Sequence, residues 1–88
     1  MTQAEFMAWA KKTVLAYVKS NDKTAYSSAL TEDDIFIVWY CKTLQNHKAL
    51  LSTPLPDGMY YEFTYNGDKD EAYLDAYLKV ENLVYRHD

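Results

Sequence analysis

Cys41 and His47 are the residues that could carry nucleophilic chemistry in this chain of 88 residues. Cys41 is the single cysteine, and a catalytic thiol needs a base within hydrogen-bond reach. Cys41 lies in the middle of an apolar run, however, and a thiol buried in apolar surroundings is poorly reactive. His47 falls at a predicted hairpin turn, too far along the strand for a direct hydrogen bond to the thiol. The sequence therefore predicts a buried, structural Cys41 and no catalytic residue.

The densest group of carboxylates lies between residues 68 and 75. Glu71 and Asp75 are four residues apart, so on a helix they would share a face and could bind a divalent cation. The spacing does not match a calcium-binding EF-hand loop, and acidic residues already have a capping role at a helix start. We therefore expect no metal and no other cofactor. The cluster comprises Asp68, Asp70, Glu71 and Asp75.

Nine tyrosines offer rings that could stack on the bases of a single nucleic-acid strand. Nucleic-acid binders usually carry a basic patch, whereas this chain has 13 acidic and 9 basic residues and a formal net charge of -4. Most of the tyrosines also fall at the helical or strand spacing of a hydrophobic core. The composition therefore disfavours nucleic acid as a partner.

The first of the elements that must position these residues is an N-terminal helix. Thr2 and Glu5 have the spacing of a capping box, in which each side chain bonds the backbone of the other residue. Apolar residues then recur every three or four positions, which predicts a helix over residues 3–19. The apolar stripe consists of Phe6, Trp9, Ala10, Val14, Tyr17 and Val18.

Three strands are predicted after a polar connection at residues 22–34. The first covers residues 35–45, the second 48–53 and the third 59–65, because each is rich in β-branched or aromatic residues or alternates apolar with polar ones. A turn at Asn46-His47 would join the first two strands, and the Pro- and Gly-containing loop before residue 59 would join the last two.

A second helix is predicted at the C-terminal end. Asn66-Gly67 would turn the chain, and the acidic residues that follow would cap a helix that ends near Val84. Its apolar residues are Tyr73, Leu74, Tyr77, Leu78, Val80, Val84 and Tyr85. The sequence thus predicts a single α+β domain over residues 1–88, a two-layer α-β-β-β-α fold with a three-stranded antiparallel meander and two helices.

The run at residues 35–44, IFIVWYCKTL, is apolar at both alternating sets of positions, so both of its faces should be covered. One set would face the helices: Ile35, Ile37, Trp39 and Cys41. The other set has no certain cover, since either the connection at residues 22–34, a helix or another molecule could lie on it. As the first strand of a meander, the run is also an exposed edge. The candidate interface comprises Phe36, Val38, Tyr40, Leu50 and Tyr60.

Two stretches carry a resemblance to known proteins. They are WYCKTLQNHKALLST at residues 39–53 and DGMYYEFTYNGDKDEAYLDAY at residues 57–77. Both resemble a family of short proteins encoded by phages and prophages of Gram-positive bacteria, with the CKTLQN and YNGDK runs as the most specific parts. The resemblance implies a phage protein that acts in the bacterial cytoplasm. It carries over no activity and no catalytic residues.

The predicted function is therefore that of a small, non-catalytic phage protein that binds and modulates a bacterial host protein, such as a defence or replication factor. We expect it to form a homodimer or larger homo-oligomer, because self-association would cover the second apolar face of the strand at residues 35–44. The alternative is a phage DNA-metabolism accessory protein that binds single-stranded nucleic acid. No apolar run reaches 18 residues and no signal-peptide pattern is present, so a cytoplasmic protein without a membrane partner is expected.

Overall fold

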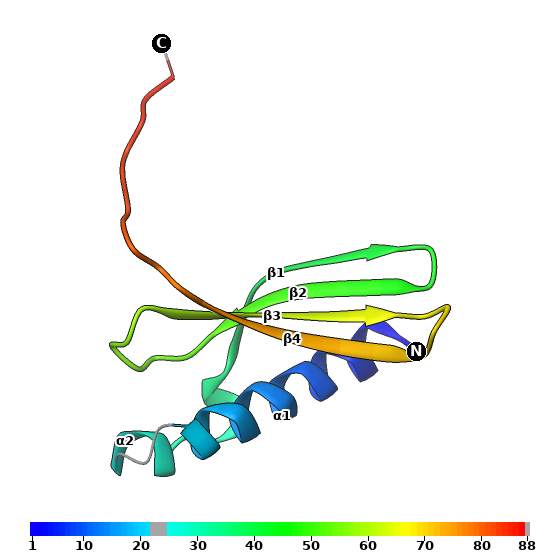
Figure 1. Cartoon of the computed structure of the whole chain (residues 1–88), viewed down its shortest axis with the longest axis horizontal. Helices are drawn as coiled ribbons and strands as arrows, with labels where there is room; N and C mark the ends of the chain where they lie inside the picture. Colours follow the sequence, from blue (N-terminus) through cyan, green and yellow to red (C-terminus); the bar gives the residue numbers. More distant parts are fainter. Residues whose placement is uncertain (22–24, 88) are drawn as a thin grey trace.

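A computed structural model describes residues 1–21 and 25–87 of the chain. Its helical elements all precede the strands of a single sheet (Figure 1). The helical elements are α1 (Gln3–Asn21), α2 (Ala25–Ser28) and the 3-10 turn η1 (Glu32–Asp34). The strands are β1 (Phe36–Thr43), β2 (Asn46–Ser52), β3 (Met59–Asn66) and β4 (Glu71–Leu78).

The capping box predicted at the start of α1 is confirmed. The backbone N–H of Thr2 donates to Oε1 of Glu5 at 2.7 Å, and the backbone N–H of Glu5 donates to Oγ1 of Thr2 at 3.1 Å. The hydrogen bonds from Thr2 hold the pKa of Glu5 below its usual value. The helix continues to Asn21, whose side-chain amide donates to the Tyr17 carbonyl at 2.8 Å. The helix thus ends two residues after the predicted end at residue 19.

The strands form an antiparallel sheet in the order β1-β2-β3-β4. The prediction of a mixed α+β fold is confirmed, but the three-stranded meander with a C-terminal helix is wrong. Residues 71–78 form β4, which pairs with β3 over eight residue pairs from Met59–Leu78 to Asn66–Glu71. In this segment apolar residues alternate with polar and tyrosine residues, so one face of the strand can pack on the core while the other meets water.

The turn between β1 and β2 lies two residues earlier than predicted. Leu44 and Gln45 form it, and Leu44 has a positive φ of 55°. The predicted turn residues Asn46 and His47 are instead the first two residues of β2. This shift places His47 inside the sheet, where it is 2% exposed.

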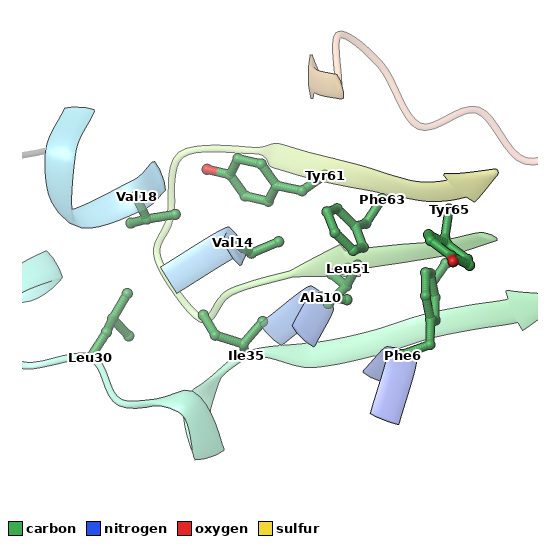
Figure 2. Packing of buried hydrophobic residues seen from close by; sticks show 11 residues of the cluster. Phe6, Ala10, Val14, Val18, Leu30, Ile35, Leu51, Tyr61, Phe63 and Tyr65 are labelled. Atoms are coloured by element: carbon green, nitrogen blue, oxygen red, sulfur yellow. The ribbon is translucent and has the colours of Figure 1, made fainter. Parts of the chain in front are cut away.

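The hydrophobic core lies between α1 and one face of the sheet (Figure 2). From α1 come four residues spaced by four, Phe6, Ala10, Val14 and Val18, which form one stripe along the helix. Trp9 and Tyr17, which were predicted in the same stripe, lie at its margins and place their rings edge-on against β3. The sheet and connecting segments contribute Leu30, Ile35, Ala49, Leu51, Tyr61, Phe63 and Tyr65.

The connection before β1 lies on the same side of the sheet as α1. Leu30 and Ile35 are buried in the core cluster, and η1 begins with the Thr31 N–H donating to Asp34 Oδ2 at 2.8 Å. In Figure 1, α2 and η1 both lie beside α1. Residues 22–24 of this connection lie outside the described residues. The described part therefore does not cover the opposite face of the sheet.

The second predicted helix is absent from the described residues after β4. Residues 79–87 follow the strand as an extended segment, which we call the arm, and they have neither helical nor strand pairing. In the part of the chain that the structure describes, no helix has the length and apolarity needed to cross a membrane.

Candidate interaction surface

A β-bulge in β1 decides which side chains of the apolar run face the core. Ile37 pairs with Leu51, but the next pair joins Trp39 to Leu50, so Val38 is an extra residue on β1. An extra residue shifts the alternation by one position, and every later side chain changes face. Tyr40 therefore lies on the core side, opposite Ala49.

The prediction for this run is consequently correct before the bulge and wrong after it. Ile35 is buried and Ile37 packs against the core, as expected. Trp39 and Cys41 were expected under the helices, yet both are exposed on the opposite face. The buried, structural role predicted for Cys41 is therefore also wrong.

The face of the sheet that α1 does not cover is the candidate functional site, and we call it the open face (Figure 1). Cross-strand pairing places on it the side chains that alternate with the core residues of each strand. Two aromatic borders result, one along β1 and one along β4, with polar residues between them. The open face comprises Phe36, Trp39, Cys41, Lys48, Leu50, Tyr60, Glu62, Thr64, Tyr73, Asp75 and Tyr77.

Four rings on the open face are about half exposed. Phe36 and Trp39 on β1 are 47% and 41% exposed, and Tyr73 and Tyr77 on β4 are 45% and 51% exposed. Each border is reinforced by an apolar neighbour on the adjacent strand, since Leu50 pairs with Trp39 and Tyr60 with Tyr77. A group of large apolar side chains on one uncovered face is typical of a protein-binding surface.

Charged groups occupy the middle of the open face. Nζ of Lys48 lies 3.3 Å from Oε1 of Glu62 in an ion pair that is partly exposed. Asp75 pairs with Glu62 across the strands and is exposed. At the end of β4, the Tyr73 hydroxyl donates to Oε2 of Glu71 at 2.6 Å, a bond that raises the pKa of Tyr73. The middle of the open face thus carries one lysine and two carboxylates, and Glu71 adds a third carboxylate at the start of β4.

The open face is hollowed at the end near the β1–β2 turn. A groove of about 320 Å³ lies there, lined mainly by Trp39, Cys41, Thr43, Lys48 and Thr64. The surface of the groove is mostly apolar. The groove could therefore accept an apolar or aromatic side chain of a partner.

Three of the five residues predicted as an interface, Phe36, Leu50 and Tyr60, lie on the open face, and Val38 is exposed at the bulge. Phe36 and Val38 are exposed on β1, and Leu50 and Tyr60 are half-buried on the open face. Tyr40 is separated from them, because the bulge turns it toward α1.

Three aromatic residues of the open face were missed by sequence reasoning. Trp39 was assigned to the wrong side of β1, and Tyr73 and Tyr77 were assigned to a helix. The strict alternation in EAYLDAYL at residues 71–78 was the signal that could have found the two tyrosines. The sequence offers no comparable signal for the bulge that exposes Trp39.

Cys41 and His47 lie on opposite faces of the sheet, so they cannot act as a nucleophile and its base. The Tyr40 hydroxyl and Nδ1 of His47 share a hydrogen bond of 2.6 Å. Burial is the main cause that lowers the pKa of His47, and burial also raises the pKa of Tyr40.

A second cavity, of about 560 Å³, opens beside His47 at the turn end of the sheet. Its lining includes Met1, Lys42, Gln45 and Tyr65. Nδ1 of His47 is already hydrogen-bonded to the Tyr40 hydroxyl, so this nitrogen is not free to bind a ligand in the cavity.

The acidic cluster at residues 68–75 caps no helix, so that prediction is wrong. Oδ1 of Asn66 accepts hydrogen bonds from the backbone N–H groups of Asp68 and Lys69, which closes the β3–β4 turn. Oδ1 of Asp70 accepts from the Tyr65 hydroxyl at 2.7 Å. Among the described residues, no group of three His, Cys, Asp or Glu side chains is arranged to hold a metal ion.

A model of a family of unknown function (DUF6275) matches residues 7–87. The chain belongs to this family. The DUF6275 match spans most of α1, the whole sheet and the arm, so the open face and the arm both lie within the family region. No curated protein and no solved structure was found that matches the chain. Phage origin is not indicated by family membership and stays a prediction.

Proposed function

We propose that the chain is a non-catalytic protein-binding module that acts through the open face of its sheet. The observation that carries this proposal is the set of four half-exposed rings on the face that α1 leaves uncovered. A one-sided antiparallel sheet normally presents polar side chains to water. Here both borders are aromatic, and aromatic residues are the type most enriched in the energetic centres of protein interfaces.

We propose a bacterial host protein as the target, because two stretches of the chain resemble phage proteins. The target surface would have to match the charge pattern of the open face as well as its rings. A partner with apolar side chains and a basic centre fits, because Asp75 would otherwise lose water without a compensating charge, whereas Glu62 is already paired with Lys48.

Single-stranded nucleic acid is the alternative ligand. Tyr60 pairs with Tyr77, and Tyr73 lies four residues away on the same face of β4, so these rings could form a stacking platform. The carboxylates of Glu62 and Asp75 lie beside these rings, however, and they would repel phosphates. Binding to an oligonucleotide that weakens steeply with salt would support this alternative, and the absence of binding in low-salt buffer would contradict it.

Trp39→Asp is expected to weaken binding of the partner protein at least about tenfold, because it removes a large ring from the β1 border of the open face and adds a charge. The chain is immobilised and exposed to a lysate of the cell that produces it. A protein that is retained is then purified and titrated against the chain by calorimetry. Tyr77→Asp should have the same effect from the opposite border of the face.

The matched control is Ala8→Asp, which places the same carboxylate at an exposed position of α1. All three variants are checked for native far-UV circular dichroism before binding is measured. The proposal is wrong if the purified protein binds both open-face variants as tightly as it binds the unaltered chain.

A further inference from the structure

The arm, residues 79–87, exposes a second set of apolar side chains. Val80, Leu83, Val84 and Tyr85 are 84%, 63%, 73% and 85% exposed. Figure 1 shows the arm leaving the end of β4 and turning away from α1, toward the side of the open face. Nine extended residues reach about 30 Å, which is enough to cross a sheet of eight-residue strands.

The root of the arm is held so that the arm points away from its own domain. The backbone N–H of Lys79 donates to the Gly58 carbonyl at 2.8 Å, and Nζ of Lys79 lies 5.9 Å from the centroid of the Tyr60 ring. To lie on the open face of its own chain, the arm would have to reverse direction directly after this point. The residues at this point, Lys79, Val80 and Glu81, are not among the types that tight turns favour.

The open face is a better site for an arm than the free edge of β1. An added strand needs a regular row of backbone groups, and the bulge at Val38 interrupts that row in the middle of the strand. The open face offers apolar borders and a groove instead.

The area available indicates that the open face alone is too small for a stable dimer. Four half-exposed rings offer on the order of 300–500 Å², whereas a stable interface buries about 800 Å² on each partner. The four apolar side chains of the arm, each more than 60% exposed, add the surface that the face lacks. Face and arm together reach the required size, and both occur in every copy of the chain.

We propose that the partner of the open face is a second copy of this chain, whose arm lies across the face and places Tyr85 in the groove beside Trp39 and Cys41. This inference rests on the proposed protein-binding role of the open face and specifies its occupant. The exchange is reciprocal, so that each copy gives its arm and receives one. Two copies related by a two-fold axis then form a closed dimer.

The test measures mass and the accessibility of the face in the same samples of the full chain. Sedimentation equilibrium follows the mass from that of the 10.3 kDa chain upward as concentration increases. The rate at which Cys41 reacts with a disulfide reagent reports whether the groove is covered, because the exposed Cys41 is the single cysteine. We expect the mass to double and the reaction of Cys41 to slow in proportion to the fraction of dimer.

Tyr85→Asp should raise the concentration of half-association at least about tenfold and restore rapid reaction of Cys41. The residue lies outside the sheet, so the variant should fold normally. Tyr26→Asp is the matched control, because Tyr26 is 77% exposed on α2 and the same substitution there should leave both measurements unchanged.

Several outcomes would overturn the inference. They are a chain that stays monomeric with reactive Cys41, a monomer with protected Cys41, and a dimer that Tyr85→Asp does not weaken. Dimerisation that leaves Cys41 fully reactive would also contradict it, since the arm would then bind elsewhere. A reactive monomer would still leave the open face free for a different protein, and the Trp39→Asp titration tests that role separately.

Discussion

Phe6→Ala is expected to lower the free energy of unfolding by about 3–5 kcal/mol, the usual cost of deleting a fully buried aromatic side chain. Phe6 is 0% exposed, and its ring stacks on His47 with centroids 5.0 Å apart and contacts Phe63 at 5.6 Å. It therefore joins α1 to both β2 and β3. Small domains have only about 5–15 kcal/mol of stability, so the variant should be close to unfolding. Urea denaturation followed by far-UV circular dichroism measures the effect.

Tyr26→Ala is the control for Phe6→Ala, because it also deletes an aromatic ring but from a side chain that is 77% exposed. Its effect should stay within about 0.5 kcal/mol. Phe6→Leu should fall between the two, since it leaves a smaller cavity. A Phe6→Ala variant as stable as the Tyr26→Ala control would show that α1 is not held to the sheet through this ring.

The core position of Phe6 could be predicted from the sequence because the signals for α1 are local. The capping box at Thr2 and Glu5 marks the start of the helix, and the stripe spaced by four residues identifies the buried side. Such signals need only the residues within one or two helical turns. The helix, its start and the side that faces the core could therefore all be predicted from the sequence.

Local sequence signals could not distinguish β4 from a helix. Tyr73, Leu74, Tyr77 and Leu78 fit a helical stripe when tyrosine is counted as apolar, yet they also fit a strand with tyrosine toward water. Pairing with all eight residues of β3 decides between the two, and that is a long-range interaction. Tertiary contacts commonly override a short periodic pattern in this way.

The open face was only partly predictable for a related reason. The uncovered side of β1 was recognised from its two apolar faces, but the bulge at Val38 depends on how β1 meets β2. No Gly or Pro marks the bulge, because β1 from Phe36 to Cys41 consists of β-branched, aromatic and cysteine residues. The prediction therefore placed Trp39 on the core side and Tyr40 on the opposite side, which is the reverse of what the structure shows. The aromatic border along β4 was missed because residues 71–78 were predicted as part of a helix.

Acidification below pH 6.5 should destabilise the protein through His47. Burial lowers the pKa of His47 below its ordinary value of 6.5. As pH falls through 6.5, the unfolded chain takes up a proton on this residue before the folded chain does. The unfolded state then binds more protons, so the free energy of unfolding falls with falling pH, by at most about 1.4 kcal/mol per pH unit for one proton. Urea titrations between pH 7.5 and pH 5 measure this slope.

The double variant Tyr40→Phe/His47→Phe isolates the contribution of His47, because it removes the hydrogen-bonded pair together and keeps a ring against Phe6. The carboxylates titrate alike in both proteins, so the difference between the two slopes belongs to the histidine. The slope of the double variant should be smaller. His47→Phe alone leaves the Tyr40 hydroxyl without this acceptor and should cost about 1–3 kcal/mol at pH 7.5. Equal slopes in the double variant and the unaltered chain would mean that His47 can accept a proton without leaving its site.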